Sequence, residues 1–229
     1  MKCHFSSRLL HSAALFIIYF LPIIPAYAQP PLMRDVFAAM PDSVAPLVTK
    51  NNRLDCIDFI ENNMEAKARN VLDDYVTLEA LTSDYARFRT SAASVLEMKL
   101  LPTSDSTSVL CLLRTAQTGE PDTSRRLEDT TIRFLHPDWT PLDNADLFTI
   151  PAVSTFIYES VPDSLRATFD QALNSFESFH PVHLTIASED AVLIATLQPA
   201  YLAKDEREVI APRLRTLRFR WNGQRFLLE

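Results

Sequence analysis

Glycine is almost absent from this sequence, because only Gly119 and Gly223 occur among its 229 residues. Loops that cradle phosphate groups need several glycines, since their backbone N–H groups must approach the ligand closely, and a nucleophile elbow usually needs two. The scarcity of glycine therefore argues against nucleotide-binding proteins and α/β-hydrolases. We expect no bound cofactor.

Cysteine is also scarce, with three residues in the chain. Cys3 lies in a segment that we expect to be removed on export, which leaves Cys56 and Cys111. These two could form a disulfide in an oxidising compartment, but both stand in apolar runs that are typical of buried free thiols. Both alternatives stay open. No histidine lies next to either thiol in the sequence, so we predict no cysteine nucleophile.

The first 28 residues have the pattern of an export signal. Lys2 and Arg8 lie in a basic segment before an apolar run over 13–24, and the tripeptide AYA at 26–28 is a small-x-small cleavage pattern. The apolar run is too short for a confident membrane span. We expect cleavage after Ala28 and a mature protein in the periplasm or cell envelope, with an uncleaved anchor as the alternative.

The mature chain is acidic. The sequence has 22 lysines and arginines and 29 aspartates and glutamates. Removal of Lys2 and Arg8 leaves 22 − 2 = 20 cationic residues, so the formal net charge becomes 20 − 29 = −9. A protein with this charge is a poor partner for nucleic acid or an anionic membrane surface.

The hydrophobic pattern changes from helical to alternating after Asn70. Helical periodicity over 53–68 places Leu54, Ile57 and Met64, together with Ile60, on one expected buried face. The run VLCLLRT at 109–115 is apolar on both faces, which is typical of a central strand covered from both sides. The expected helices span 31–40, 53–68, 163–179 (with Asp163 as N-cap) and 204–209; the expected strands span 75–80, 84–90, 95–101, 108–115, 130–136, 182–187 and 191–197, before a C-terminal hairpin.

These elements predict an α+β fold in which helices pack on an antiparallel β-meander sheet. Two echoes suggest related helix-plus-sheet halves. MPDSV at 40–44 recurs as VPDSL at 161–165, and TIRF at 131–134 recurs as TLRF at 216–219. The offsets differ, 163 − 42 = 121 against 216 − 131 = 85, so duplication stays a hypothesis. We divide the mature chain into 29–145 and 146–229, which could also form one continuous domain.

One long stretch resembles a known family. MPDSVAPLVTKNNRLDCIDFIENNMEAKA at 40–68 is similar to an uncharacterised domain-of-unknown-function family of exported Bacteroidetes proteins, with NNRLD as its most specific part. The similarity continues through 80–102 and CLLRT at 111–115 and then fades. The resemblance implies an exported protein of a Gram-negative anaerobe. It implies no activity, so no catalytic residue follows from it.

Two groups of side chains could carry chemistry. His180 and His183 lie near Glu177, but no third or fourth zinc ligand follows at a recognisable spacing, so we predict no metal site and a plain surface turn. Three acids with a spacing of three, Asp55, Asp58 and Glu61, could form a glycosidase-type pair, although this spacing is what a solvated helix face requires. No serine stands in a nucleophile context, so we predict no catalytic residue.

Aromatic residues of the second half could line a ligand cavity, although core packing explains residues on one helical stripe more simply. They are Phe156, Tyr158, Phe169, Phe176 and Phe179.

The C-terminal sequence RTLRFRWNGQRFLLE predicts a hairpin with a two-residue type I′ turn at Asn222-Gly223. This turn would place Arg220 directly across from Arg225, and such a pair repels unless an anion intervenes. We name Arg218, Arg220 and Arg225 as ligand-binding candidates, while a neighbouring Asp or Glu of the chain is the more common partner.

Three functions follow as hypotheses. We favour a non-enzymatic binding module that contacts an unknown envelope protein or peptide through its sheet surface. An envelope hydrolase would need a buried carboxylate pair in a deep cleft, and a small-molecule carrier would need a large apolar void. The sequence leaves the oligomeric state open.

Overall fold

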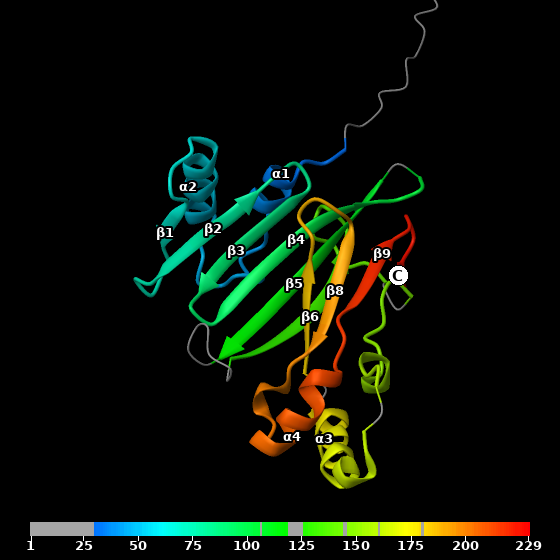
Figure 1. The fold of residues 1–229 in the computed structure, drawn as a ribbon. Coiled ribbons are helices and arrows are strands. Elements are labelled where there is room, and N and C mark those ends of the chain that lie inside the picture. The colour runs from blue at the N-terminus through cyan, green and yellow to red at the C-terminus, as the bar shows by residue number, and fades with distance from the viewer. Residues whose placement is uncertain (1–29, 106, 119–125, 144–145, 160, 180) are drawn as a thin grey trace, which may run out of the picture.

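The computed structural model describes residues 30–105, 107–118, 126–143, 146–159, 161–179 and 181–229, and in these ranges the chain forms two antiparallel sheets. Strands β1 to β6 follow chain order in one sheet, and the other has the order β10-β9-β8-β7 (Figure 1). The predicted α+β fold with helices on an antiparallel meander is confirmed. The expected export segment, 1–28, lies outside the described residues.

The six-stranded sheet forms where the sequence alternates. All five strands predicted in this half are confirmed, and the structure adds a short first strand. The sheet consists of β1 (Lys67–Arg69), β2 (Tyr75–Leu81), β3 (Tyr85–Ser91), β4 (Ser94–Pro102), β5 (Ser108–Thr118) and β6 (Leu127–Leu135).

The N-terminal helices are α1 (Met33–Ala38) and α2 (Lys50–Glu61). The helix expected over 53–68 is therefore too long at its C-terminal end. Asn63 takes a positive φ of 56°. The N–H of Met64 then donates to the carbonyl of Phe59 at 2.9 Å, and that of Asn63 to Ile60 at 3.1 Å. This hydrogen-bond pattern ends helices and frees the following residues to form β1.

The buried face of α2 also differs from the expected one. Leu54 and Met64 are exposed, whereas Arg53, Cys56 and Ile57 are buried. The helix is rotated so that a polar side chain, Arg53, points inward. Hydrophobic periodicity could not indicate this, because it treats arginine as a surface residue.

The second half begins with short helical turns and builds the four-stranded sheet. Both helices and the hairpin over 182–197 predicted here are confirmed, and the predicted C-terminal hairpin forms in a different register. The elements are η1 (Val153–Phe156), η2 (Asp163–Leu165), α3 (Arg166–Phe179), β7 (Val182–Ile186), β8 (Val192–Leu197), η3 (Pro199–Tyr201), α4 (Lys204–Ile210), η4 (Ala211–Arg213), β9 (Leu217–Trp221) and β10 (Phe226–Leu228).

The capping role predicted for Asp163 is wrong. Asp163 begins the 3-10 turn η2, Pro162 precedes it, and no side chain caps this turn. Pro162 has an extended backbone, so the chain enters α3 through a tight turn rather than through an aspartate cap.

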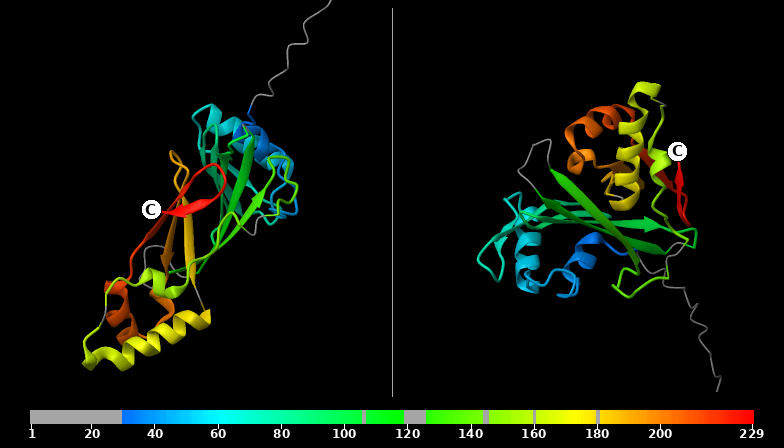
Figure 2. Two further views of the ribbon diagram at one scale, coloured as in Figure 1. Left: turned by 90° about the vertical axis from the view of Figure 1, so that its right-hand side faces the viewer. Right: turned by 90° about the horizontal axis from the view of Figure 1, so that it is seen from below.

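Other elements pack on both faces of the six-stranded sheet. Figure 2 shows α1 and α2 on one face, with the second sheet, α3 and α4 on the other. The helix-side core packs Phe37 and Cys56 against Phe88 and Leu96, and the inter-sheet core packs Cys111 and other strand residues of the first sheet against the second. The inter-sheet core draws residues from both sides of position 145.

The two cysteines lie in separate cores on opposite faces of the sheet. Both are free and buried. Burial raises the pKa of Cys56 to about 11 and raises that of Cys111 as well. Of the two alternatives left open by the sequence, the structure therefore has free, protonated thiols.

The C-terminal hairpin has a different register from the predicted one. Phe226 pairs with Trp221, and Leu227 pairs with Arg220. This pairing leaves a loop of four residues, 222–225. The side-chain oxygen of Asn222 stabilises the loop, because it accepts hydrogen bonds from the backbone N–H groups of Gln224 at 2.9 Å and Arg225 at 2.8 Å. The predicted Arg220–Arg225 repulsion does not occur.

Candidate functional site

A cleft of about 560 Å³ lies on the helix side of the six-stranded sheet. The helices cover only part of this face, since α2 contacts β1 and β2 while α1 contacts β3 and β4. Strands β5 and β6 have no comparable contact with these helices and form the floor of the cleft. Its lining residues are Pro41, Ser43, Val44, Leu112, Arg114, Thr131, Arg133, Leu135, Trp139 and Pro141.

The first wall of the cleft is the loop over 40–48, which Arg53 holds in place. The guanidinium donates to the carbonyl of Met40 at 2.6 Å, to the carbonyl of Val48 at 2.9 Å and to Oδ1 of Asp42 at 3.0 Å. Arg53 itself is only 2% exposed. This loop and Arg53 both belong to the stretch that carries the family resemblance, so its NNRLD part has a physical role in shaping the cleft.

The second wall is the turn that contains Trp139. Its φ is +70°, a left-handed backbone conformation that is unfavourable for a bulky residue. The indole N–H donates to the carbonyl of Val36 at 2.8 Å, which ties the turn to α1. Strained residues of this kind persist where the surroundings fix them, and they often mark binding sites.

The floor of the cleft carries two arginines. In the β5–β6 register Arg114 pairs with Thr131 and Leu112 pairs with Arg133, so the two arginines are diagonal neighbours on one face. Such neighbours have Cα atoms about 7–8 Å apart. The side chain of Arg114 donates to the carbonyl of Val44.

Arg133 has no ion pair or side-chain hydrogen bond with any described residue. None of the lining residues is Asp, Glu, His or Cys. Asp129 lies on the same face as Arg133 and is diagonal to Arg114, but it is outside the cleft and pairs with neither arginine. The cleft therefore has a local positive charge in an acidic protein.

A smaller cleft of about 180 Å³ adjoins the first. The two clefts share Val44 and Arg114, and the hydrogen bond between these residues separates them. The smaller cleft is lined by the remainder of the loop through Val48 and by hydroxyl residues of β3 and β4, namely Thr90, Ser91 and Ser94.

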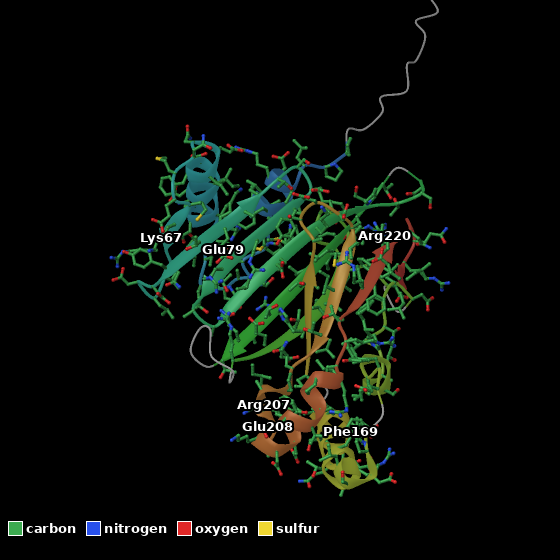
Figure 3. The ribbon with its side chains drawn as sticks, in the orientation of Figure 1. Lys67, Glu79, Phe169, Arg207, Glu208 and Arg220 are labelled. Carbon is green, nitrogen blue, oxygen red and sulfur yellow. The ribbon has the colours of Figure 1, made fainter. Side chains whose placement is uncertain are left out.

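The opposite face of the six-stranded sheet holds a network of buried charges. The Tyr85 hydroxyl donates to Oε1 of Glu97 at 2.9 Å, and Arg87 lies 3.0 Å from the same oxygen. Arg87 also donates to Glu79 at 2.7 Å (Figure 3 labels Glu79). Burial raises the pKa of Glu97, although Arg87 and Tyr85 oppose the rise.

Lys99 links this network to the second sheet. Its ammonium group donates to the carbonyl of Ser188, in the β7–β8 turn, at 2.7 Å and lies 2.8 Å from Asp84. Every charge of this network has a partner within the chain, which favours a structural role. The Lys99–Ser188 hydrogen bond is the contact through which the network joins the two sheets.

His183 also lies between the sheets. Its Nδ1 is 3.1 Å from the Thr130 hydroxyl, and its Nε2 is 3.4 Å from Glu128. Burial lowers the pKa of His183, Glu128 opposes this, and Arg87 and Arg126 add to the lowering. The histidine is half-buried rather than part of the expected surface turn. His180 lies outside the described residues.

The arginines named from the sequence lie on the second sheet. Arg220 donates to Glu229 at 2.6 Å and Arg218 donates to the same carboxylate at 3.1 Å (Figure 3 shows Arg220 on β9). These two arginines lower the pKa of the Glu229 carboxyl. The expected acidic neighbour is therefore the last residue of the chain. Arg225 is exposed in the loop between β9 and β10.

A cleft of about 160 Å³ adjoins these arginines and is lined by Arg215, Thr216, Leu217, Arg218, Leu228 and Glu229. Unlike the cleft on β5 and β6, it contains a carboxylate, that of Glu229, which already pairs with Arg218.

The remaining candidates lie apart from the clefts. Asp55, Asp58 and Glu61 form an exposed helix face, as the solvated reading of their spacing requires. Three of the aromatic residues pack in the inter-sheet core, and Tyr158 and Phe179 are exposed. Within the described ranges, no three His, Cys, Asp or Glu side chains gather where a metal ion could bind.

The sequence contains one indication of Arg133, which was not among the predicted site residues. Thr131 and Arg133 of TIRF occupy the same positions as Thr216 and Arg218 of TLRF, and each pair lines a cleft. The Asn-Gly turn follows Arg218 but not Arg133, so the sequence marks only Arg218 as part of a hairpin. The two arginines differ in the presence of an acid, which depends on the fold.

Comparisons with known proteins agree with this fold. A domain of an uncharacterized protein from Porphyromonas gingivalis W83 has a similar structure, with a TM-score of 0.68 and 24% identity over 88% of this chain and 99% of that chain. Its source is a Bacteroidetes species, as the resemblance implied. The search of curated proteins gives no match.

The family comparison extends further along the chain than the resemblance seen in the sequence. A family model described as "Protein of unknown function (DUF3256)" matches residues 27–226, so the similarity includes the C-terminal half. The comparison thus confirms that the chain is similar to an uncharacterised family, as the resemblance implied. Because the match spans most of the 229 residues, the chain belongs to the DUF3256 family.

Proposed function

We propose that the protein is an exported, non-enzymatic binding module that holds a segment of another envelope protein in the cleft on β5 and β6. The observation that carries this proposal is the cleft itself, in which Arg133 lacks a partner among the described residues. The volume of about 560 Å³ is typical of ligand sites. Export is supported by the basic and apolar pattern of 1–28.

The construction of the walls supports a binding role. Arg53 holds one wall in place through three hydrogen bonds. Trp139, which has a strained backbone conformation, holds the other through its hydrogen bond to the Val36 carbonyl. A preformed site loses less conformational entropy on binding than a mobile one. A hydroxyl nucleophile such as Ser43 or Thr131 would need an adjacent general base, and the residues lining this cleft include no Asp, Glu, His or Cys.

Site-specific photo-crosslinking in the native envelope tests this proposal. A photoreactive amino acid replaces Thr131, an exposed threonine in the cleft floor, or Thr216, its counterpart in TLRF on the second sheet. We expect a discrete protein adduct from position 131 and none from position 216. Adducts from position 216 alone would move the function to the C-terminal arginines, and no adduct from either position would refute a binding role for both sheets.

A further inference from the structure

The arginine pair on β5 and β6 indicates the chemistry of the ligand. Two like charges on diagonal neighbours of a sheet repel, and nothing in the cleft offsets them. Arg114 has one of its donors on the Val44 carbonyl and Asp129 as a diagonal neighbour. Arg133 has neither, so it is the group that gains most from an anionic ligand.

The donor geometry favours a planar oxyanion. A guanidinium presents five N–H donors in a fixed fork that matches the two oxygens of a carboxylate. The surrounding groups are hydroxyls, at Ser43 and Thr131. Accessible apolar side chains are also present, at Leu135 and Pro141. A ligand that fits this lining has a carboxylate next to apolar groups.

The shape of the site favours a chain over a compact molecule. The smaller cleft continues the first one beyond the Arg114–Val44 contact, and both have the loop over 40–48 as a wall. An extended peptide can lie on both sides of this contact, placing side chains in each cleft, whereas a compact metabolite would occupy one.

We propose that the cleft binds an acidic peptide segment, with an Asp or Glu carboxylate on the Arg133 guanidinium and apolar neighbours against Leu135 and Pro141. This inference rests on the proposed function and adds the chemistry of the partner. The mature protein has an expected net charge of −9, so most of its surface repels an acidic segment. The cleft, which has arginines and no acid, is where such a segment is attracted.

Fluorescence anisotropy with a labelled ten-residue peptide of alternating Glu and Val tests the inference on the mature protein. The matched peptide has Gln in place of Glu, and inorganic phosphate serves as a competitor. We expect saturable binding of the Glu peptide that weakens as salt increases, and about ten-fold or greater weakening of the Gln peptide, because a charged hydrogen bond is lost. Equal binding of both peptides, or complete displacement by an equal concentration of phosphate, would overturn the inference.

Variants of the chain locate the binding. Arg133→Ala should weaken binding of the Glu peptide about ten- to a hundred-fold, and Arg133→Lys should weaken it less, because it keeps the charge but loses the fork. Thr131→Glu adds a carboxylate to the cleft floor and should also weaken binding of the Glu peptide about ten-fold or more. The matched control is Arg166→Ala, an exposed arginine of α3 outside these clefts. Loss of binding in Arg218→Ala but not in Arg133→Ala would contradict the assignment.

The two proposals can fail separately. An adduct at position 131 combined with equal binding of the Glu and Gln peptides would leave the binding module in place and refute the acidic ligand. An absence of both adduct and peptide binding would refute both.

Discussion

Arg53 shows how one buried side chain can shape a surface site. It lies on a helix whose other inward residues are apolar, and it provides hydrogen bonds to two loop carbonyls. Buried carbonyls without partners are costly, so a loop of this kind needs an internal donor. The position of the cleft wall therefore depends on a residue that does not line the cleft.

Replacement of Arg53 tests this role. Arg53→Met keeps much of the volume but removes the donors to Met40 and Val48, and we expect the free energy of unfolding to fall by about 2–4 kcal/mol. Arg34→Met is the matched control, because Arg34 forms an exposed ion pair with Glu61, which should contribute about 1 kcal/mol or less. Urea denaturation measures both. Equal small losses would show that the loop does not depend on Arg53.

His183 gives the inter-sheet contact a pH dependence. Burial lowers its pKa in the folded state below the unfolded value of about 6.5. The folded state therefore prefers neutral histidine, and the associated stability is present above about pH 6.5 and is lost as the pH falls toward the folded pKa. The nearby Glu128 opposes this trend, and Arg87 and Arg126 support it.

We expect the wild-type protein to lose unfolding free energy relative to His183→Gln between pH 7.5 and pH 5.5, since glutamine has no proton to gain. Chemical denaturation at three pH values across this range measures the difference. His136→Gln, at an exposed histidine, is the control and should follow the wild type. If the wild type instead gains stability relative to His183→Gln on acidification, the pairing with Glu128 dominates.

At the scale of elements, alternation and helical periodicity predicted most strands and helices, because each reports which side chains face a core. The end of α2 was missed because Asn63 adopts a left-handed conformation, which the pattern around Asn62-Asn63 allows but does not require. The register of β9 and β10 was missed because the side chain of Asn222 stabilises a four-residue loop.

Gly223 provides a test of that loop. Its φ is +93°, and a Cβ added there would meet only the backbone nitrogen of Ser104, at an ordinary contact distance of 3.6 Å, and its side-chain oxygen at 3.9 Å. The cost of Gly223→Ala is therefore conformational, and we expect a loss of about 1 kcal/mol in unfolding free energy. Gly223→Asn should lose less, because asparagine tolerates this region. Gln224→Ala, in the same loop, is the control. An unchanged stability in Gly223→Ala would argue for a different turn.

The candidate site was the part least accessible from the sequence. The segments that form the cleft lie far apart in the chain, and Arg114 and Arg133 become neighbours only through the β5–β6 register. The absence of an acid beside Arg133, and its presence beside Arg218, depends on which strands and termini meet. Composition and local motifs contain no such information.

At the scale of the whole molecule, the six-stranded sheet has two different faces. One packs on the second sheet through the apolar inter-sheet core and the Lys99–Ser188 hydrogen bond. The other carries α1 and α2 (Figure 2) and, beside them, the cleft on β5 and β6. None of the helices in the described ranges is long and apolar enough to cross a membrane. On the helix-side face, the cleft on β5 and β6 is the part that α1 and α2 leave uncovered.

The central claim is that this cleft binds an acidic segment. Amide chemical-shift mapping of the mature protein, titrated with the peptide of alternating Glu and Val, tests it most directly. The account predicts saturable shifts confined to 42–44, 112–114 and 131–135, together with the Trp139 indole. Saturable shifts that instead gather at 216–228, or shifts that spread over the surface without saturation, would contradict it.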